Sequence, residues 1–166
     1  MSTPTTLAPI SLGQGEGEAL WAFGTLATIK ASSETTGGRV AVIEHLAPQG
    51  AGSPLHVHHH EDEWFYVIEG ELAFLVGGKK FEASAGAFVY GPRGIPHTFT
   101  VTSAQARFLL VAEPAGLENF MRTLAEQART RSLPPMATGQ PPDPGRMAAI
   151  AAEYGIEILG PPGIPD

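Results

Sequence analysis

Residues 55–64 have the sequence LHVHHHEDEW and contain four of the six histidines of the chain. In an extended strand, side chains two residues apart point to the same face, so His56 and His58 present two imidazoles side by side. Glu63 follows after a short acidic stretch and adds a carboxylate oxygen. The stretch therefore predicts part of a metal site built on β-strands.

A fourth ligand has to come from elsewhere in the chain, and His97 is the best-placed imidazole outside this stretch. It follows the segment GPRGIP at 91–96, whose glycines and prolines force a bend that can aim one side chain inward. The chain has no cysteine, so any metal has to use nitrogen and oxygen ligands. Three imidazoles and one carboxylate suit one divalent transition-metal ion: Fe, Ni, Mn, Co, Cu or Zn.

The other histidines have competing interpretations. His59 points to the face opposite His58 and is expected at the surface. His60 shares the parity of His56 and His58 if the strand continues, so it competes with Glu63 as a ligand. His45 stands alone in a predicted strand, where we expect a hydrogen-bonded residue of the barrel wall.

The acidic residues between the histidines are open to a structural interpretation. Glu61 and Asp62 are expected to form a plain acidic turn, and only Glu63 has the spacing of a ligand.

Short β-rich segments separated by turn residues follow one another through the middle of the chain. The segment 64–76 is broken once at Gly70, and Gly77–Gly78 predicts a hairpin. This spacing is typical of an all-β barrel or sandwich. The predicted strands cover 21–30, 39–46, 64–76 as two strands, 81–83, 87–90, 97–101 and 107–113, with a loop at 32–38.

The pattern changes after Pro114. Apolar residues recur at helical spacing over 117–128, and a second short helix is predicted from an N-cap at Asp143 to Gly155. The apolar faces of both helices are interpreted as packing surfaces, and the tail after Gly155 as an edge strand. The proline-rich segment 131–142 is either a lid over the barrel mouth or a surface linker.

The 166 residues suit a single domain, divided into a lead-in (1–18), a barrel (19–113) and a helical C-terminal extension (114–166). The net charge is −7 and no basic patch is visible, so we expect no nucleic-acid partner. Neither a signal peptide nor a membrane-length apolar run is present, which favours a cytoplasmic protein with no membrane partner.

Two spaced motifs connect these residues to a known family. The first is Gly50-x5-His56-x-His58-x4-Glu63-x6-Gly70, and the second is Gly86-x5-Pro92-x-Gly94-x2-His97. Both resemble the conserved motifs of the cupin superfamily. The resemblance implies a cupin jelly-roll barrel (a double-stranded β-helix) with an N-terminal strand extension and two short C-terminal helices. It places His56, His58, Glu63 and His97 in the lumen around the metal.

The wider chain is similar to bacterial single-domain quercetinase-type cupins. The similarity lies in LWAFGTLATIKASSETTGG near the start, in PAGLENFMRTLAEQA after the barrel, and in the closing DPGRMAAIAAEYGIEILGP. It implies a dioxygenase that cleaves a flavonol-like or other enol substrate with O₂, in which Glu63 is both ligand and catalytic base. The second motif departs at Val101, where the family often has Asn, so substrate analogy is weaker than fold analogy.

Strand parity predicts which apolar residues accompany the ligands. Phe65 and Val67 share the face of Glu63, so they either line the substrate pocket or fill the barrel core. Phe99 and Val101 are also assigned to the substrate pocket. Trp64 and Tyr66 then face outward, which together with the frequent pairing of cupins favours a homodimer. Two other functions remain open: a non-redox metal enzyme such as an isomerase, epimerase or cyclase, and a non-catalytic small-molecule-binding cupin.

Overall fold

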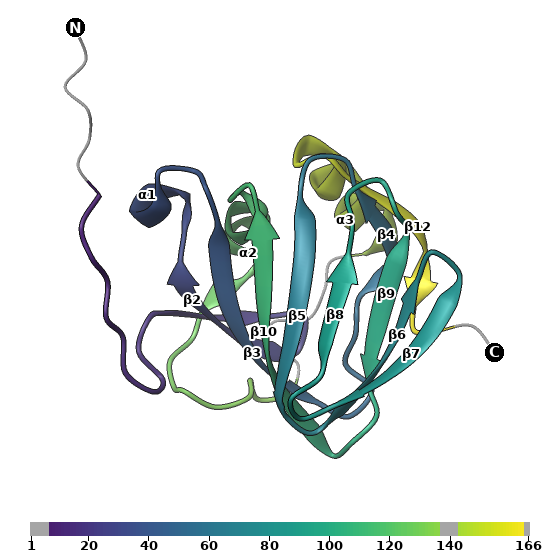
Figure 1. Ribbon diagram of the computed structural model, residues 1–166, viewed down its shortest axis with the longest axis horizontal. Helices are drawn as coiled ribbons and strands as arrows, with labels where there is room; N and C mark the ends of the chain where they lie inside the picture. The colour runs from purple at the N-terminus through teal and green to yellow at the C-terminus, as the bar shows by residue number, and fades with distance from the viewer. Residues whose placement is uncertain (1–6, 137–142, 165–166) are drawn as a thin grey trace, which may run out of the picture.

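The computed structural model describes residues 7–136 and 143–164, which form two antiparallel β-sheets and three helices (Figure 1). The helices are α1 (Ser33–Thr36), α2 (Leu117–Leu124) and α3 (Pro144–Glu153). The strands are β1 (Glu18–Ala22), β2 (Thr25–Ala31), β3 (Ala41–Pro48), β4 (Pro54–His58), β5 (Asp62–Glu69), β6 (Glu71–Val76), β7 (Lys79–Ser84), β8 (Phe88–Gly91), β9 (His97–Val101), β10 (Gln105–Glu113), β11 (Glu126–Gln127) and β12 (Ile156–Pro162).

The seven-stranded sheet has the order β11-β1-β2-β3-β10-β5-β8, and the five-stranded sheet has the order β12-β4-β9-β6-β7. From β3 to β6 and again from β7 to β10, consecutive strands alternate between the two sheets. This is the jelly-roll arrangement that the sequence predicts, with the side chains of both inner faces between the sheets.

Most of the predicted barrel strands are confirmed. The reversal between β5 and β6 falls at Gly70, whose φ is 83° and where an added Cβ would lie 2.3 Å from the carbonyl oxygen of Gln105. Only glycine fits there, because both the left-handed backbone and the close contact exclude a side chain. The hairpin between β6 and β7 turns at Gly77–Gly78, as predicted.

The prediction of one strand over 21–30 was wrong, since this segment is the hairpin of β1 and β2. Ala22 pairs with Thr25, leaving Phe23 and Gly24 as a two-residue loop with φ values of 54° and 74°. Two left-handed residues are the mark of a type I′ turn, which Asn-Gly signals far more clearly than Phe-Gly. A smaller difference is the single helical turn of α1 inside the predicted loop 32–38.

The C-terminal helices and strand are of the predicted types, but the first helix is shorter than predicted. The first predicted helix stops at Leu124, four residues early, because the chain becomes extended at Ala125 and Glu126–Gln127 pair with β1 as β11. The second helix has the predicted N-cap, where Asp143 Oδ1 accepts a hydrogen bond from the backbone N–H of Arg146 at 3.1 Å. The predicted tail strand is β12, at the edge of the five-stranded sheet beside β4.

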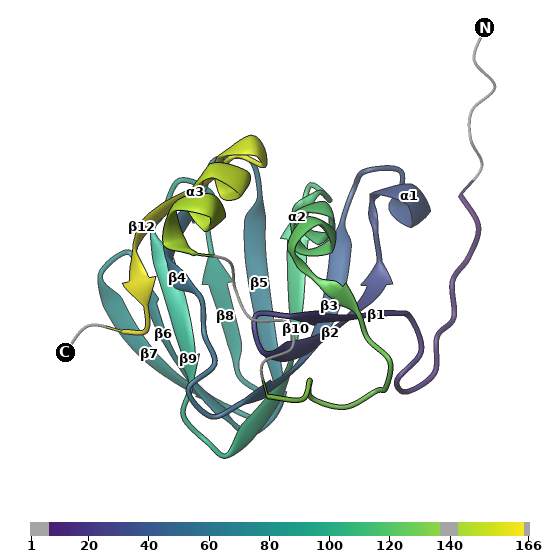
Figure 2. The same cartoon turned by 180° about the vertical axis from the view of Figure 1, so that it is seen from behind.

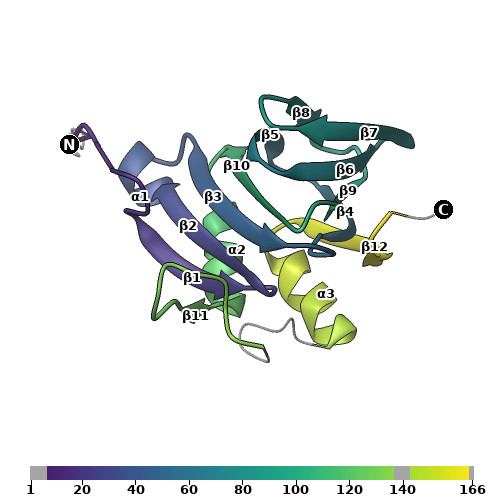
Figure 3. The ribbon, with the colours of Figure 1, turned by 90° about the horizontal axis from the view of Figure 1, so that it is seen from below.

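Both longer helices lie on the same side of the molecule (Figures 2 and 3). They contact each other through Phe120 and Tyr154, whose ring centroids are 5.7 Å apart. Leu117, Phe120, Met121 and Met147 join the main hydrophobic core, which also fills the space between the sheets. The helices therefore cover the lumen from one end while packed side chains fill its interior.

Three sequence expectations concern the surface and the surroundings of the barrel. Tyr66 is exposed, and Trp64 is half-buried and stacks on Tyr90 at 5.4 Å, so the homodimer stays a prediction. Of the proline-rich segment 131–142, residues 137–142 lie outside the described residues, so the choice between a lid and a surface linker stays a prediction. Among the described residues, no helix is long and apolar enough to cross a membrane.

Candidate metal centre and adjoining cavity

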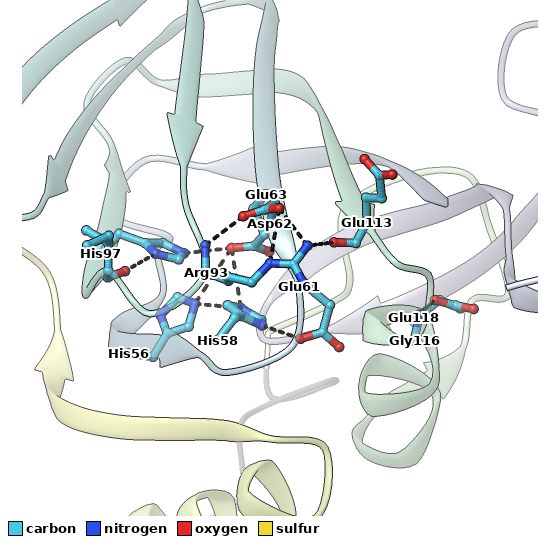
Figure 4. A network of polar contacts seen from close by, with 11 residues as sticks. His56, His58, Glu61, Asp62, Glu63, Arg93, His97, Glu113, Gly116 and Glu118 are labelled. Atoms are coloured by element: carbon cyan, nitrogen blue, oxygen red, sulfur yellow. Dashed lines mark hydrogen bonds and ion pairs between the residues drawn. The ribbon is translucent and has the colours of Figure 1, made fainter. Parts of the chain in front are cut away.

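Side chains from three strands meet where the two sheets face each other. His56 and His58 lie on β4, His97 on β9 and Glu63 on β5. β4 and β9 are neighbours, with His56 directly opposite His97, whereas β5 belongs to the other sheet. All four side chains are buried and point toward one another (Figure 4). The predicted ligands are thus brought together.

The distances among the four side chains suit a single cation. One ligand atom from each residue lies within 4.8 Å of all the others. His58 Nε2 is 3.1 Å from His56 Nε2 and 3.3 Å from Glu63 Oε2, and His56 Nε2 is 4.0 Å from Glu63 Oε2. Ligands bonded to one metal at about 2.1 Å lie roughly 3–4 Å apart, so these separations fit.

In each of the three imidazoles, the hydrogen bond of Nδ1 determines that Nε2 faces the centre. His56 Nδ1 lies 2.7 Å from the carbonyl oxygen of Pro54, and His97 Nδ1 lies 3.1 Å from that of Ile95. His58 Nδ1 lies 3.2 Å from Glu61 Oε2. These oxygens can only accept, so each Nδ1 donates and each Nε2 is left with its lone pair directed at the centre.

This arrangement brings acceptors against acceptors. His97 Nε2 is 2.6 Å from Glu63 Oε2, and the Nε2 atoms of His56 and His58 are 3.1 Å apart. Such contacts between lone pairs are favourable only when a proton or a cation lies between them. The four residues therefore fit a divalent metal ion, and they could hold one as three imidazoles and one carboxylate.

The electrostatics of the centre favour an ionised carboxylate. Burial opposes ionisation of Glu63, but the facing imidazoles of His58, His97 and His56 outweigh it and lower its pKa to about 2. Burial also lowers the pKa of His56 to about 3, with the charge of His97 acting in the same direction. Burial opposes charge on His58 as well, yet Glu63 and Glu61 overcome it and raise the pKa of that imidazole.

Glu61 and Asp62 do not form the exposed acidic turn that the sequence suggests. Glu61 is buried beside His58, where its carboxylate accepts the Nδ1 proton. Asp62 pairs with Arg93 at 2.7 Å and accepts a hydrogen bond from the backbone N–H of Arg93 (Figure 4). One acid thus supports a candidate ligand, and the other fixes the loop that leads to His97.

The two remaining histidines of the run lie outside the centre. His59 is exposed and its Nε2 lies 3.0 Å from Glu157 Oε2, on the surface as expected. His60 is also exposed and lies against the backbone of Gly155 instead of joining the other imidazoles, so Glu63 is the residue at the centre.

A cavity of about 190 Å³ adjoins the centre on the side of His56 and Glu63. Its walls are mostly apolar and come from the β1–β2 turn, the barrel strands, α2, α3 and β12. The apolar side chains of the wall are Phe23, Pro54, Phe65, Phe99, Leu110, Leu117, Phe120, Met121, Met147, Ile156, Ile158 and Pro162.

Of the four predicted pocket residues, Phe65 and Phe99 line this cavity, whereas Val67 and Val101 are not among its lining residues and belong to the core. All four side chains point inward, but they lie at different depths between the sheets. Residues on one face of a strand are about 6.6 Å apart, so Phe65 lies one step from Glu63 and Val67 lies two. The second step reaches the packed interior.

It was not predicted from the sequence that the helices and His45 form part of the cavity wall. Leu117, Phe120, Met121 and Met147 pack in the core, as expected, but also form part of the cavity wall. His45 lies on β3, in the barrel wall as expected, and it also lines the cavity. The expectation of a hydrogen-bonded residue was wrong for its buried Nε2, which has no partner among the described residues. No periodicity signals either feature, because both depend on which distant segments meet.

Comparison with known proteins agrees with this geometry. The family model described as a cupin domain matches residues 42–112. The chain is 28% identical to quercetin 2,3-dioxygenase of Bacillus subtilis over 123 residues, which are 74% of this chain and 36% of that protein. It is also 36% identical over 56 residues to an uncharacterised protein of Streptomyces coelicolor, covering 34% of this chain and 53% of that protein. The chain therefore spans about a third to a half of the length of these curated relatives.

Solved structures of low sequence identity share the fold. A predicted oxalate decarboxylase from Thermotoga maritima superposes with a TM-score of 0.58 at 21% identity, covering 63% of this chain and 99% of the other. An RmlC-like cupin from Shewanella frigidimarina gives a TM-score of 0.57 at 18% identity, covering 67% and 96%. With the two-sheet topology, these matches show that the chain has the cupin jelly-roll fold, and residues 42–112 are the part that matches the cupin domain model.

Proposed function

We propose that this protein is a metal-dependent dioxygenase that acts on a flavonol-like or other enol substrate, with one divalent transition-metal ion held by His56, His58, Glu63 and His97. The observation that carries the proposal is the position of the apolar cavity, which reaches the cation centre at His56 and Glu63. The similarity to a quercetin 2,3-dioxygenase over 123 residues supports the same class of reaction.

Each residue has a role that follows from its place. The Nδ1 hydrogen bonds of the three imidazoles hold their Nε2 atoms toward the cation. Glu63 is ionised at neutral pH, so its carboxylate can accept the proton of an enol that enters from the cavity. A bound divalent cation would supply Lewis-acid polarisation of the substrate oxygen. The apolar walls orient the body of the substrate and exclude water from the reacting oxygen.

The size of the cavity favours compact enols over large ones. Its volume is about 190 Å³. Sites for drug-sized ligands occupy about 300–1,000 Å³, so a three-ring flavonol fits this cavity only if the wall moves. A single-ring or similarly small enol fits without rearrangement. Within the proposed class, a compact substrate is therefore favoured.

The experiment that tests the proposal is a matrix of metals and enols under air. Protein freed of metal is reloaded with Fe²⁺, Ni²⁺, Mn²⁺, Co²⁺, Cu²⁺ or Zn²⁺ and incubated with quercetin or the single-ring enol 3-hydroxy-4-pyranone. We expect at least one metal to give O₂ uptake that matches substrate loss, and the His97→Ala variant to give none. Consumption at the same rate without O₂ would instead indicate a non-redox enzyme. Binding without consumption would indicate a binding module.

A further inference from the structure

His45 has hydrogen-bonding capacity that the protein itself does not use. It lies on β3 with its ring stacked on Phe108 of β10, at a centroid distance of 5.0 Å and an interplanar angle of 8°. The residue is 6% exposed, and its buried Nε2 has no hydrogen-bond partner among the described residues. A buried polar group is normally paired, so an unpaired imidazole needs an explanation.

The cavity wall supplies that explanation, since His45 is one of its few polar side chains. The other polar side chains of the wall already have a partner within the protein or belong to the centre. Thr25 Oγ1 donates to the carbonyl oxygen of Ala22 at 2.8 Å, and Ser53 Oγ lies 3.4 Å from Thr98 Oγ1. His56 and Glu63 belong to the cation centre. Among the described wall residues, His45 is thus the polar side chain left for a ligand.

We propose that His45 recognises the ligand of this cavity, by a hydrogen bond from its imidazole to a second polar group of a compact, mainly apolar molecule whose first oxygen lies at the cation centre. This inference rests on the proposed function only in placing that first oxygen. The ligand class it names has a body about the size of one ring and two separated oxygen functions.

The chemistry of the wall supports this class. Burial lowers the pKa of His45 to about 4, against a weaker opposing effect of Glu63, so the imidazole is neutral at physiological pH. A neutral imidazole has one donor and one acceptor nitrogen, so it can bind a hydroxyl or a carbonyl. A site built to hydrogen-bond a hydroxyl rejects the analogue that lacks it, because the buried group then stays unpaired. No lysine or arginine lines the wall within the described part of the chain, so phosphate and carboxylate groups are poor candidates for the second function.

The test is equilibrium binding of single-ring probes to Co²⁺-loaded protein under nitrogen, measured by calorimetry. Phenol carries one oxygen, while resorcinol and hydroquinone carry a second hydroxyl that cannot reach the same cation. We expect at least one of the two diols to bind about tenfold or more tightly than phenol. In His45→Phe, which keeps a ring against Phe108, this preference should fall below about threefold with phenol affinity little changed. His45→Gln should retain part of it.

Two further measurements separate recognition from structural support. Removing an unpaired buried polar group should raise the melting temperature of metal-free His45→Phe or His45→Leu, whereas a residue that holds the fold would lower it in both. Leu110→Met changes the same wall without a polar group and should leave the diol preference intact. The inference is overturned if the wild type shows no preference for either diol, if His45→Phe keeps it, or if both variants melt earlier. Because no turnover is measured, failure of the oxygenase proposal would appear separately, as absent O₂ uptake.

Discussion

At the scale of single residues, spacing predicts the candidate ligands but not what surrounds them. His56, His58 and Glu63 could be assigned because strand parity and motif spacing restrict them, and His97 because a bend precedes it. Glu61 could not, because an acid in an acidic run has the same local pattern whether it is solvated or buried. Its contact with His58 Nδ1 depends on how the loop after β4 folds back.

Glu61 should matter for metal affinity although it does not face the cation. A carboxylate that accepts a hydrogen bond from Nδ1 of a ligating histidine orients the ring. It also makes Nε2 a better electron-pair donor to the metal. We expect Glu61→Gln to weaken binding of Zn²⁺ by about 10- to 100-fold, measured by competition with a chromophoric chelator. The matched control is Glu157→Gln, which removes the exposed partner of His59 and should leave the affinity unchanged. Equal affinities in the two variants would show that Glu61 has no such role.

His45 predicts a pH dependence of stability with a definite sign. Its pKa is about 4 in the folded protein and 6.5 when unperturbed, so the unfolded chain binds the proton first as the pH falls. Stability is therefore lost between pH 6.5 and about 4. Between pH 7 and 4.5, metal-free wild type should lose roughly 2–3 kcal/mol more than His45→Phe, measured by urea denaturation. Parallel losses in the two proteins would mean that His45 does not titrate in this way.

At the scale of elements, the sequence predicts kinds of structure better than their ends. The alternation that identified β5 and β9 also gave the correct inward face, but it contains no information on depth. Val101 was expected beside the substrate, and Val67 either there or in the barrel core. Both pack in the interior, Val67 two steps from Glu63 and Val101 two steps from His97. The early end of α2 has a similar origin, because pairing of Glu126–Gln127 with β1 overrides a helical pattern.

In the β1–β2 turn, Phe23 suits the apolar cavity better than it suits the backbone conformation of the turn. Phe23 takes a left-handed conformation, with φ of 54°, and lines the cavity. Asn adopts the left-handed conformation at a free-energy cost about 1 kcal/mol lower than that of Phe. This difference offsets the loss of the apolar contacts of the Phe23 ring. We therefore expect Phe23→Asn to keep the fold while phenol affinity falls at least about threefold, by calorimetry.

The neighbouring glycine provides the control for this prediction. Gly24 has φ of 74°, and a Cβ there would meet no atom within 4 Å. Gly24→Ala should thus cost about 1 kcal/mol of stability through the backbone alone and leave phenol affinity unchanged. If both variants alter phenol affinity equally, the turn acts by holding the hairpin and not through the ring of Phe23.

At the scale of the whole molecule, the barrel supplies the cation centre, while segments outside the two motifs supply much of the cavity. The wall takes residues from the β1–β2 turn, from α2 and from α3 and β12, which are far apart in the sequence. β12 pairs with β4, the strand that carries His56 and His58, so the C-terminal segment packs directly beside the centre. The fold and the candidate ligands could be predicted because the spacing within two short motifs restricts both. The shape of the cavity could not, because it results from long-range packing.

Metal binding should also be visible in the stability of the whole chain. A cation that binds only the folded state raises the free energy of unfolding by RT ln(1 + [M]/Kd), about 4 kcal/mol at a thousandfold excess over Kd. Adding EDTA to metal-loaded wild type should therefore lower its melting temperature by several degrees. The His56→Ala/His58→Ala variant should show no such shift, and a shift of equal size there would place the metal elsewhere.

The most direct test of the central claim is anomalous X-ray diffraction at the absorption edge of a metal soaked into crystals of this protein. The convergence of three Nε2 atoms and one carboxylate predicts a single strong peak, bonded at about 2.0–2.2 Å to His56, His58, His97 and Glu63. A peak coordinated instead by the exposed His59 or His60, or no peak between β4, β5 and β9, would contradict it.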